Sequence, residues 1–135
     1  MKKIFLDANI LIDLITRRVK IDGIERIDFR QLYSSTLSAH ILFYVNKIKY
    51  NSPEAKKSAD ILNHISLTPL TEEIVKNAYK VKYYDYEDTL QYLMALNAEC
   101  NYILTRDKKD FEKIKKIIPS NIKIITNLNT LLHNS

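Results

Sequence analysis

Short apolar runs alternate along the chain with longer segments whose apolar residues recur at helical spacing. The runs have the length and composition of buried strands, and we predict strands at 3–6, 31–34, 66–70, 101–105 and 122–125. Short strands that alternate with helices favour a parallel sheet covered by helices on both faces. We therefore predict an α/β fold, a three-layer α/β/α sandwich around a central, mainly parallel sheet.

The segments between the runs predict helices at 10–15, 37–48, 53–65, 71–79, 85–99 and 128–132. Ser35 or Thr36, Pro53 and Thr71 supply typical helix starts. Two helices are predicted to bury faces made of the following residues: Leu37, Ile41, Tyr44, Val45 and Ile48 in one, and Ile74, Val75, Ala78 and Tyr79 in the other. The stretch 17–28 is charged and irregular, with a turn at Gly23, and only a turn is predicted at 108–111.

The composition is that of one globular domain spanning residues 1–135. Apolar residues make up 46% of the chain and charged residues 27%, and no segment approaches the roughly 20 apolar residues of a membrane helix. The basic start resembles a signal peptide, but Asp7 and Asp13 interrupt its apolar run. We expect a cytoplasmic protein without membrane contact. The single cysteine, Cys100, excludes an internal disulfide framework and a cysteine zinc cluster.

The balance of 21 basic against 16 acidic residues leaves a net charge of +5, which permits nucleic acid as a partner without requiring it. The single glycine is more informative, because glycine-rich loops for nucleotide phosphates need several. Any contact with phosphate must come from side chains, metals or helix ends.

Acidic residues follow two of the predicted strands. Asp7 ends the first strand, Asp107 follows the fourth, and 85–88 opens the helix that leads into the fourth strand. In open α/β sheets, sites form at the carboxyl ends of strands, and carboxylates are ligands that Mg²⁺ or Mn²⁺ prefers. Each acid has an ordinary alternative role, since Asp7 and Asp107 could cap helices or turns and Asp85 and Asp88 could complement a helix dipole.

Three segments carry a resemblance to a known family. The segment 6–13 (LDANILID) resembles the opening motif of PIN domains, 85–91 (DYEDTLQ) their third motif, and 102–111 (YILTRDKKDF) the fourth. Order and spacing fit over essentially the whole chain, and the chain is most similar to the VapC-like toxins of bacterial toxin–antitoxin pairs.

The resemblance implies a Mg²⁺- or Mn²⁺-dependent endoribonuclease that hydrolyses RNA phosphodiester bonds. Asp7, Asp88 and Asp107 match the catalytic, metal-binding acids, Asn9 matches the polar residue beside the first acid, and Asp85 and Asp110 match secondary acidic positions. The resemblance further implies RNA as substrate, a homodimer and a cognate antitoxin protein.

One departure from the family pattern is prominent. After the second strand such domains usually carry a glutamate in a pattern like Ser-x-x-Thr-x-x-Glu, and here His40 is expected to occupy its place. Imidazole suits Mn²⁺ better than Mg²⁺. His40 is interpreted either as lining the acidic pocket or as a hydrogen-bonded core histidine.

His40 also leaves an alternative function open, a weakened PIN-like module that acts by binding RNA or protein. A phosphatase of the haloacid-dehalogenase type is disfavoured, because it needs an aspartate where Asn9 stands. Arg106, Lys108 and Lys109 could hold RNA phosphates. Tyr83, Tyr84 and Tyr86 could stack on unpaired bases or serve in packing.

Overall fold

A computed structural model describes residues 1–133 and has a five-stranded sheet in which every strand pair is parallel. The strand order is β3-β2-β1-β4-β5, and the strands are β1 (Ile4–Leu6), β2 (Leu32–Ser35), β3 (Ser66–Thr68), β4 (Tyr102–Leu104) and β5 (Lys123–Ile125). All five predicted strands are present within a few residues of the expected bounds.

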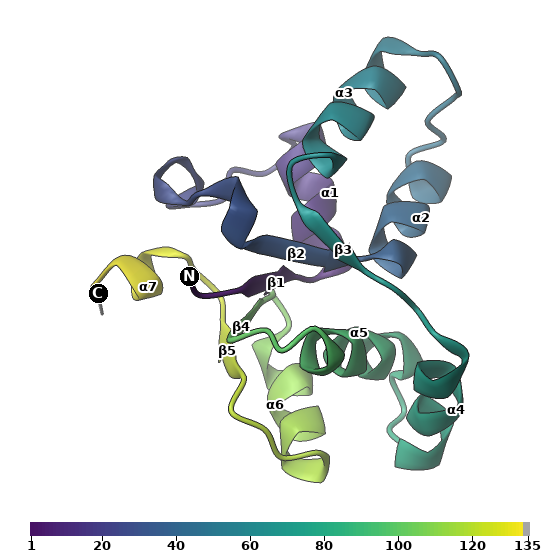
Figure 1. Cartoon of the computed structure of the whole chain (residues 1–135), viewed down its shortest axis with the longest axis vertical. Coiled ribbons are helices and arrows are strands. Elements are labelled where there is room, and N and C mark those ends of the chain that lie inside the picture. Colours follow the sequence, from purple (N-terminus) through teal and green to yellow (C-terminus); the bar gives the residue numbers. More distant parts are fainter. Residues whose placement is uncertain (134–135) are drawn as a thin grey trace.

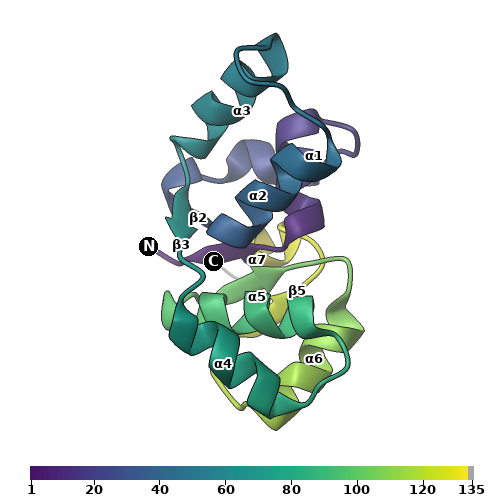
Figure 2. The ribbon, with the colours of Figure 1, turned by 90° about the vertical axis from the view of Figure 1, so that its right-hand side faces the viewer.

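Helices cover both faces of the sheet, as Figures 1 and 2 show. One layer contains α1 (Ala8–Thr16), α2 (Thr36–Val45) and α3 (Pro53–Leu62), and the other contains α4 (Glu72–Val81), α5 (Tyr86–Asn97) and α6 (Lys108–Ile117). The last helix among the described residues is α7 (Asn129–His133). The predicted three-layer α/β/α sandwich is confirmed.

The strands divide the core into two apolar clusters because successive side chains point to opposite faces. Phe5 and Ile103 pack against α4, α5 and α6, whereas Ile4, Leu6 and Leu104 pack against α1 and α2. Strands buried on both faces explain why the apolar runs are continuous rather than alternating. No helix among residues 1–133 has the length and apolar character needed to span a membrane.

The strand order has a reversal at β1. From β1 the chain builds β2 and β3 outward on one side, then returns through α4 and α5 to place β4 on the other side of β1. The carboxyl ends of β1 and β4 therefore flank the switch point of the sheet, where open α/β folds bind ligands. Asp7 lies there, and its amide donates a hydrogen bond to the Leu104 carbonyl at 3.1 Å.

Two predicted helix faces are wrong in part. In α2 the buried residues are Ser38 and Leu42, while Tyr44 and Val45 are exposed. In α4 Ile74 and Ala78 are buried, but Tyr79 is exposed. The apolar spacing in these helices fits more than one face, and tertiary packing selects another face in α2 and a narrower one in α4. Cys100 is buried, as its apolar character suggests.

The helix α6 is missing from the sequence-based prediction. Only Phe111 and Ile114 of its ten residues are buried, so a lysine-rich surface obscures its apolar stripe. Its short stripe nevertheless has helical spacing, i and i+3.

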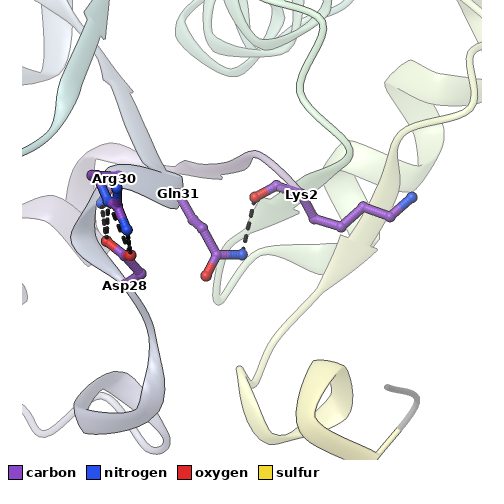
Figure 3. A network of polar contacts seen from close by, with 4 residues as sticks. All are labelled: Lys2, Asp28, Arg30 and Gln31. Carbon is purple, nitrogen blue, oxygen red and sulfur yellow. Dashed lines mark hydrogen bonds and ion pairs between the residues drawn. The ribbon is translucent and has the colours of Figure 1, made fainter.

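The irregular segment after α1 contains two short 3₁₀ turns, η1 (Ile24–Arg26) and η2 (Phe29–Gln31), and η2 leads directly into β2. The expected turn at Gly23 is present with φ of 88°, and a Cβ there would lie 2.8 Å from Oδ1 of Asn129. Figure 3 shows how η2 is held: Arg30 pairs with Asp28, and Nε2 of Gln31 donates to the Lys2 carbonyl at 3.1 Å.

Candidate active site

Asp7 is fixed by hydrogen bonds to both of its carboxylate oxygens. Oδ1 accepts from the Ala8 amide at 2.8 Å, and Oδ2 accepts from the Thr105 hydroxyl at 2.9 Å. Asp7 thus caps α1, as one interpretation of the sequence expects, and the cap also directs the carboxylate toward β4. Burial raises the pKa of Asp7, an effect that the hydrogen bond from Thr105 partly offsets.

Asp88 is a buried acid whose ionised form is strongly disfavoured. It lies in the first turn of α5, is only 8% exposed, and its Oδ2 is buried without a hydrogen-bond partner. Burial, together with the charges of Asp7, Asp85 and Asp107, raises the pKa of Asp88 to about 8. Asp85 caps the same helix, its Oδ1 accepting from the Asp88 amide at 3.0 Å.

Asp107 and Asp110 reach the site from the start of α6. Oδ1 of Asp110 accepts hydrogen bonds from the hydroxyls of both Tyr83 and Tyr84, each at 2.8 Å. These bonds hold the pKa of Asp110 below its usual range. Asp107 is exposed, and slight desolvation together with the Asp110 carboxyl beside it raises the pKa of Asp107. The Asp107 amide donates to the Thr105 hydroxyl at 2.9 Å.

We call the five aspartates Asp7, Asp85, Asp88, Asp107 and Asp110 the acidic cluster. Within it, one oxygen from each of Asp85, Asp88 and Asp110 lies within 4.8 Å of the others. Asp7 and Asp107 are close enough for their charges to raise the pKa of Asp88. The tightest group therefore includes two residues that the resemblance implied to be secondary, and Asp7 and Asp107 flank it.

The acidic cluster suits a hard divalent cation. Buried polar atoms are ordinarily hydrogen-bonded, and crowded carboxylates repel one another unless a cation or proton joins them. The partnerless Oδ2 of Asp88 and the all-oxygen donor set are of the type that Mg²⁺ or Mn²⁺ prefers.

Asn9 and His40 are outside the tight acidic group. Asn9 lies in the first turn of α1 and is exposed. His40 is exposed as well, and its ring stacks on that of Tyr44 with centroids 6.0 Å apart. The interpretation of His40 as a buried core histidine is therefore wrong. The physical reason is helical geometry, since Ser38 is buried and a residue two positions later points to the opposite side.

The capping geometry of α2 also shifts the family pattern by one residue. Ser35 is the N-cap and accepts from the Ser38 amide at 2.9 Å. If Ser35 and Ser38 take the places of the serine and threonine of Ser-x-x-Thr-x-x-Glu, the glutamate position falls on Ile41, which is partly buried and lies one turn after Ser38.

Several supporting residues were not predicted from the sequence. The Ser35 hydroxyl donates to Oε1 of Gln91 at 2.8 Å, and Nε2 of Gln91 donates to the Ser38 hydroxyl at 2.9 Å. This buried network holds the start of α2 against α5, one turn from Asp88. Arg106 pairs with the buried Asp13 of α1 instead of remaining available for phosphate. Pairs so distant in sequence leave no local pattern. The position of Thr105 at the end of a predicted strand is the one local signal that could have indicated its role.

Comparisons with known proteins agree with the fold. A family model described as "PIN domain" matches residues 3–109. Ribonuclease VapC1 of Aquifex aeolicus (strain VF5) is 26% identical over 124 residues, which covers 79% of this chain and 83% of that relative. The predicted resemblance to VapC-like proteins is confirmed, and the chain belongs to the PIN domain family.

Proposed function

We propose that this protein is a divalent-metal-dependent endoribonuclease of the VapC type. The observation that carries the proposal is the buried, partnerless Oδ2 of Asp88 inside a group of three carboxylates within 4.8 Å. The family membership and the similarity to a relative named Ribonuclease VapC1 support RNA as the substrate.

Asp85, Asp88 and Asp110 would hold the cation, with Asp7 and Asp107 beside them. When bound, Mg²⁺ or Mn²⁺ supplies Lewis acidity toward a phosphate and makes water a stronger nucleophile. Other side chains of the protein orient these carboxylates. Thr105 fixes Asp7, and the two tyrosine hydroxyls occupy Oδ1 of Asp110, which leaves its other oxygen available.

Lysines around α6 would hold the RNA backbone. Lys108 and Lys109 follow Asp107 directly and are exposed, and the charge of Lys113 contributes to the lowered pKa of Asp110. Because Arg106 pairs with Asp13, we assign it to positioning rather than to phosphate binding.

We further propose a homodimer and a cognate antitoxin as partners, and a cytoplasmic location, on the grounds of family membership. The alternative, a weakened module that binds RNA or protein without cleaving, depends on the absence of the usual glutamate from α2. The retained acidic cluster favours the enzyme.

The test is cleavage of a mixed-sequence RNA by the purified protein with Mg²⁺, with Mn²⁺ and with a chelator. We expect cleavage with either metal and none with the chelator. Asp88→Asn should abolish cleavage, and Asp60→Asn, which changes an exposed acid of α3, should not. Metal-independent cleavage, or equal activity of Asp88→Asn and the parent, would contradict the proposal.

A further inference from the structure

A groove of about 460 Å³ lies between α4 and the start of α5. Its lining consists of Val75, Lys76, Tyr79, Lys80 and Tyr86, and we call it the α4–α5 groove. The volume lies within the range of small-ligand pockets, about 300–1,000 Å³. None of these five residues belongs to the acidic cluster.

The two tyrosines give the groove aromatic walls. Tyr79 is 78% exposed, so its ring contributes little to the core. Tyr86 is 40% exposed, and its hydroxyl donates to the Val75 carbonyl at 2.9 Å, which holds its ring across the two helices. An exposed ring and a fixed ring at one groove are the components of a stacking site.

The two lysines add positive charge at the same place. Lys76 and Lys80 are one turn apart on α4 and therefore on the same side of the helix. Lys76 forms an exposed pair with Glu72, which is a weak and exchangeable contact. Aromatic rings combined with lysines match an unpaired nucleotide, whose base stacks while its phosphate meets a cation.

The groove is connected to the acidic cluster through a short segment of chain. Tyr84 donates its hydroxyl to Asp110, Asp85 belongs to the cluster, and Tyr86 lines the groove. Three consecutive residues thus run from the cluster to the groove, and Figure 2 shows α4 and α5 side by side in this layer.

We propose that the α4–α5 groove binds an unpaired base of a single-stranded RNA substrate, beside the phosphate held at the acidic cluster. This rests on the proposed function and deepens it, because it assigns a binding place for one base of the substrate strand outside the acidic cluster. A second copy of the chain would suit the two tyrosines, which are enriched at protein interfaces, but not the two lysines, which are depleted there, whereas an unpaired nucleotide suits both.

The test measures binding rather than cleavage. A fluorescently labelled single-stranded oligoribonucleotide is titrated with the full chain carrying Asp88→Asn, in chelator, and anisotropy is recorded. Adding Tyr79→Ala or Tyr86→Ala should weaken binding about 5-fold or more. Tyr79→Phe keeps the ring and should bind like the parent. Tyr50→Ala, at a residue 98% exposed, is the matched control and should leave binding unchanged.

A duplex of the same sequence should bind equally to the parent and to the tyrosine variants, since its bases are already stacked. Equal single-strand affinity of Tyr79→Ala and the parent would overturn the inference. Light scattering in which Tyr79→Ala loses a dimer while RNA affinity is unchanged would also overturn it and would assign the groove to a second copy. Cleavage of RNA by the wild type together with unchanged binding by the tyrosine variants rejects only this inference. A wild type that neither binds nor cleaves RNA rejects the proposed function itself.

Discussion

The hydroxyl of Thr105 donates a hydrogen bond to Oδ2 of Asp7 over 2.9 Å, joining residues 98 positions apart in the chain. The same hydroxyl accepts from the Asp107 amide. One side chain therefore sets the position of the acid after β1 relative to the acid after β4. Its place at the switch point of the sheet explains how two short strands can bring these carboxylates to the same edge of the sheet.

Thr105→Val should lower the cleavage rate about 10- to 100-fold, because it removes both hydrogen bonds while keeping the side-chain volume. The free energy of unfolding should fall by about 1–3 kcal/mol, since the Asp107 amide and Asp7 lose a partner. Steady-state cleavage and urea denaturation measure the two effects. Thr105→Ser retains the hydroxyl and should restore most of the activity. A valine variant as active as wild type would show that the link does not position the acids.

Asp88→Asn should stabilise the metal-free protein at alkaline pH. The pKa of Asp88 is about 8 in the folded chain against 3.8 ordinarily, so between these values the folded state binds more protons. The contribution of Asp88 to stability therefore falls as pH rises from about 4 to 8. We expect the variant to exceed wild type by about 1–3 kcal/mol at pH 8 and by nothing below pH 4.

Urea denaturation in chelator across this pH range measures the difference, with Asp60→Asn as the control that should follow wild type. A difference between Asp88→Asn and wild type that does not change with pH would contradict the assigned protonation of Asp88.

Arg106→Ala should destabilise the fold by about 1–3 kcal/mol, because it leaves the buried Asp13 carboxylate without its counter-charge. Arg106 is half exposed, so the loss should be smaller than for a fully buried pair. The double variant Asp13→Asn with Arg106→Ala should recover part of the stability, as measured by thermal unfolding. If the double variant lost as much stability as the sum of the losses in Asp13→Asn and Arg106→Ala, the two residues would not be energetically coupled.

Two variants of α2 test which position of this chain corresponds to the glutamate of the family pattern. Counting from the observed cap Ser35 places it at Ile41, and the sequence alone placed it at His40. Ile41→Glu should therefore strengthen Mg²⁺ binding more than His40→Glu does, because position 41 is partly buried and lies one turn after Ser38, which contacts Gln91, whereas position 40 is exposed. Calorimetric titration of both variants measures this. A stronger effect of His40→Glu would restore the register expected from sequence.

The strands and the acids were predictable because their causes are local. Continuous apolar runs mark strands buried on both faces, and an aspartate directly after such a run marks the edge where sites form. The bounds of α6 were not predictable from its lysine-rich surface, and the face of α2 depends on the contact of Ser35 and Ser38 with Gln91, more than fifty positions away. The resemblance implied Asp7, Asp88 and Asp107 as the metal ligands. The place of Asp110 in the tightest group depends on hydrogen bonds from Tyr83 and Tyr84, which are distant in the sequence and were not predictable.

We propose that the acidic cluster holds a divalent cation, and a Mn²⁺ titration monitored through the electron paramagnetic resonance signal of free Mn²⁺ tests this most directly. At pH 7.5 the wild type and Asp60→Asn should remove Mn²⁺ from solution with the same affinity, and Mg²⁺ should compete for the site. Asp88→Asn should weaken this binding at least about 10-fold, because it replaces a buried carboxylate oxygen of the acidic cluster that has no hydrogen-bond partner. Saturable Mn²⁺ binding that is unchanged in Asp88→Asn, or no saturable binding in the wild type, would contradict the account.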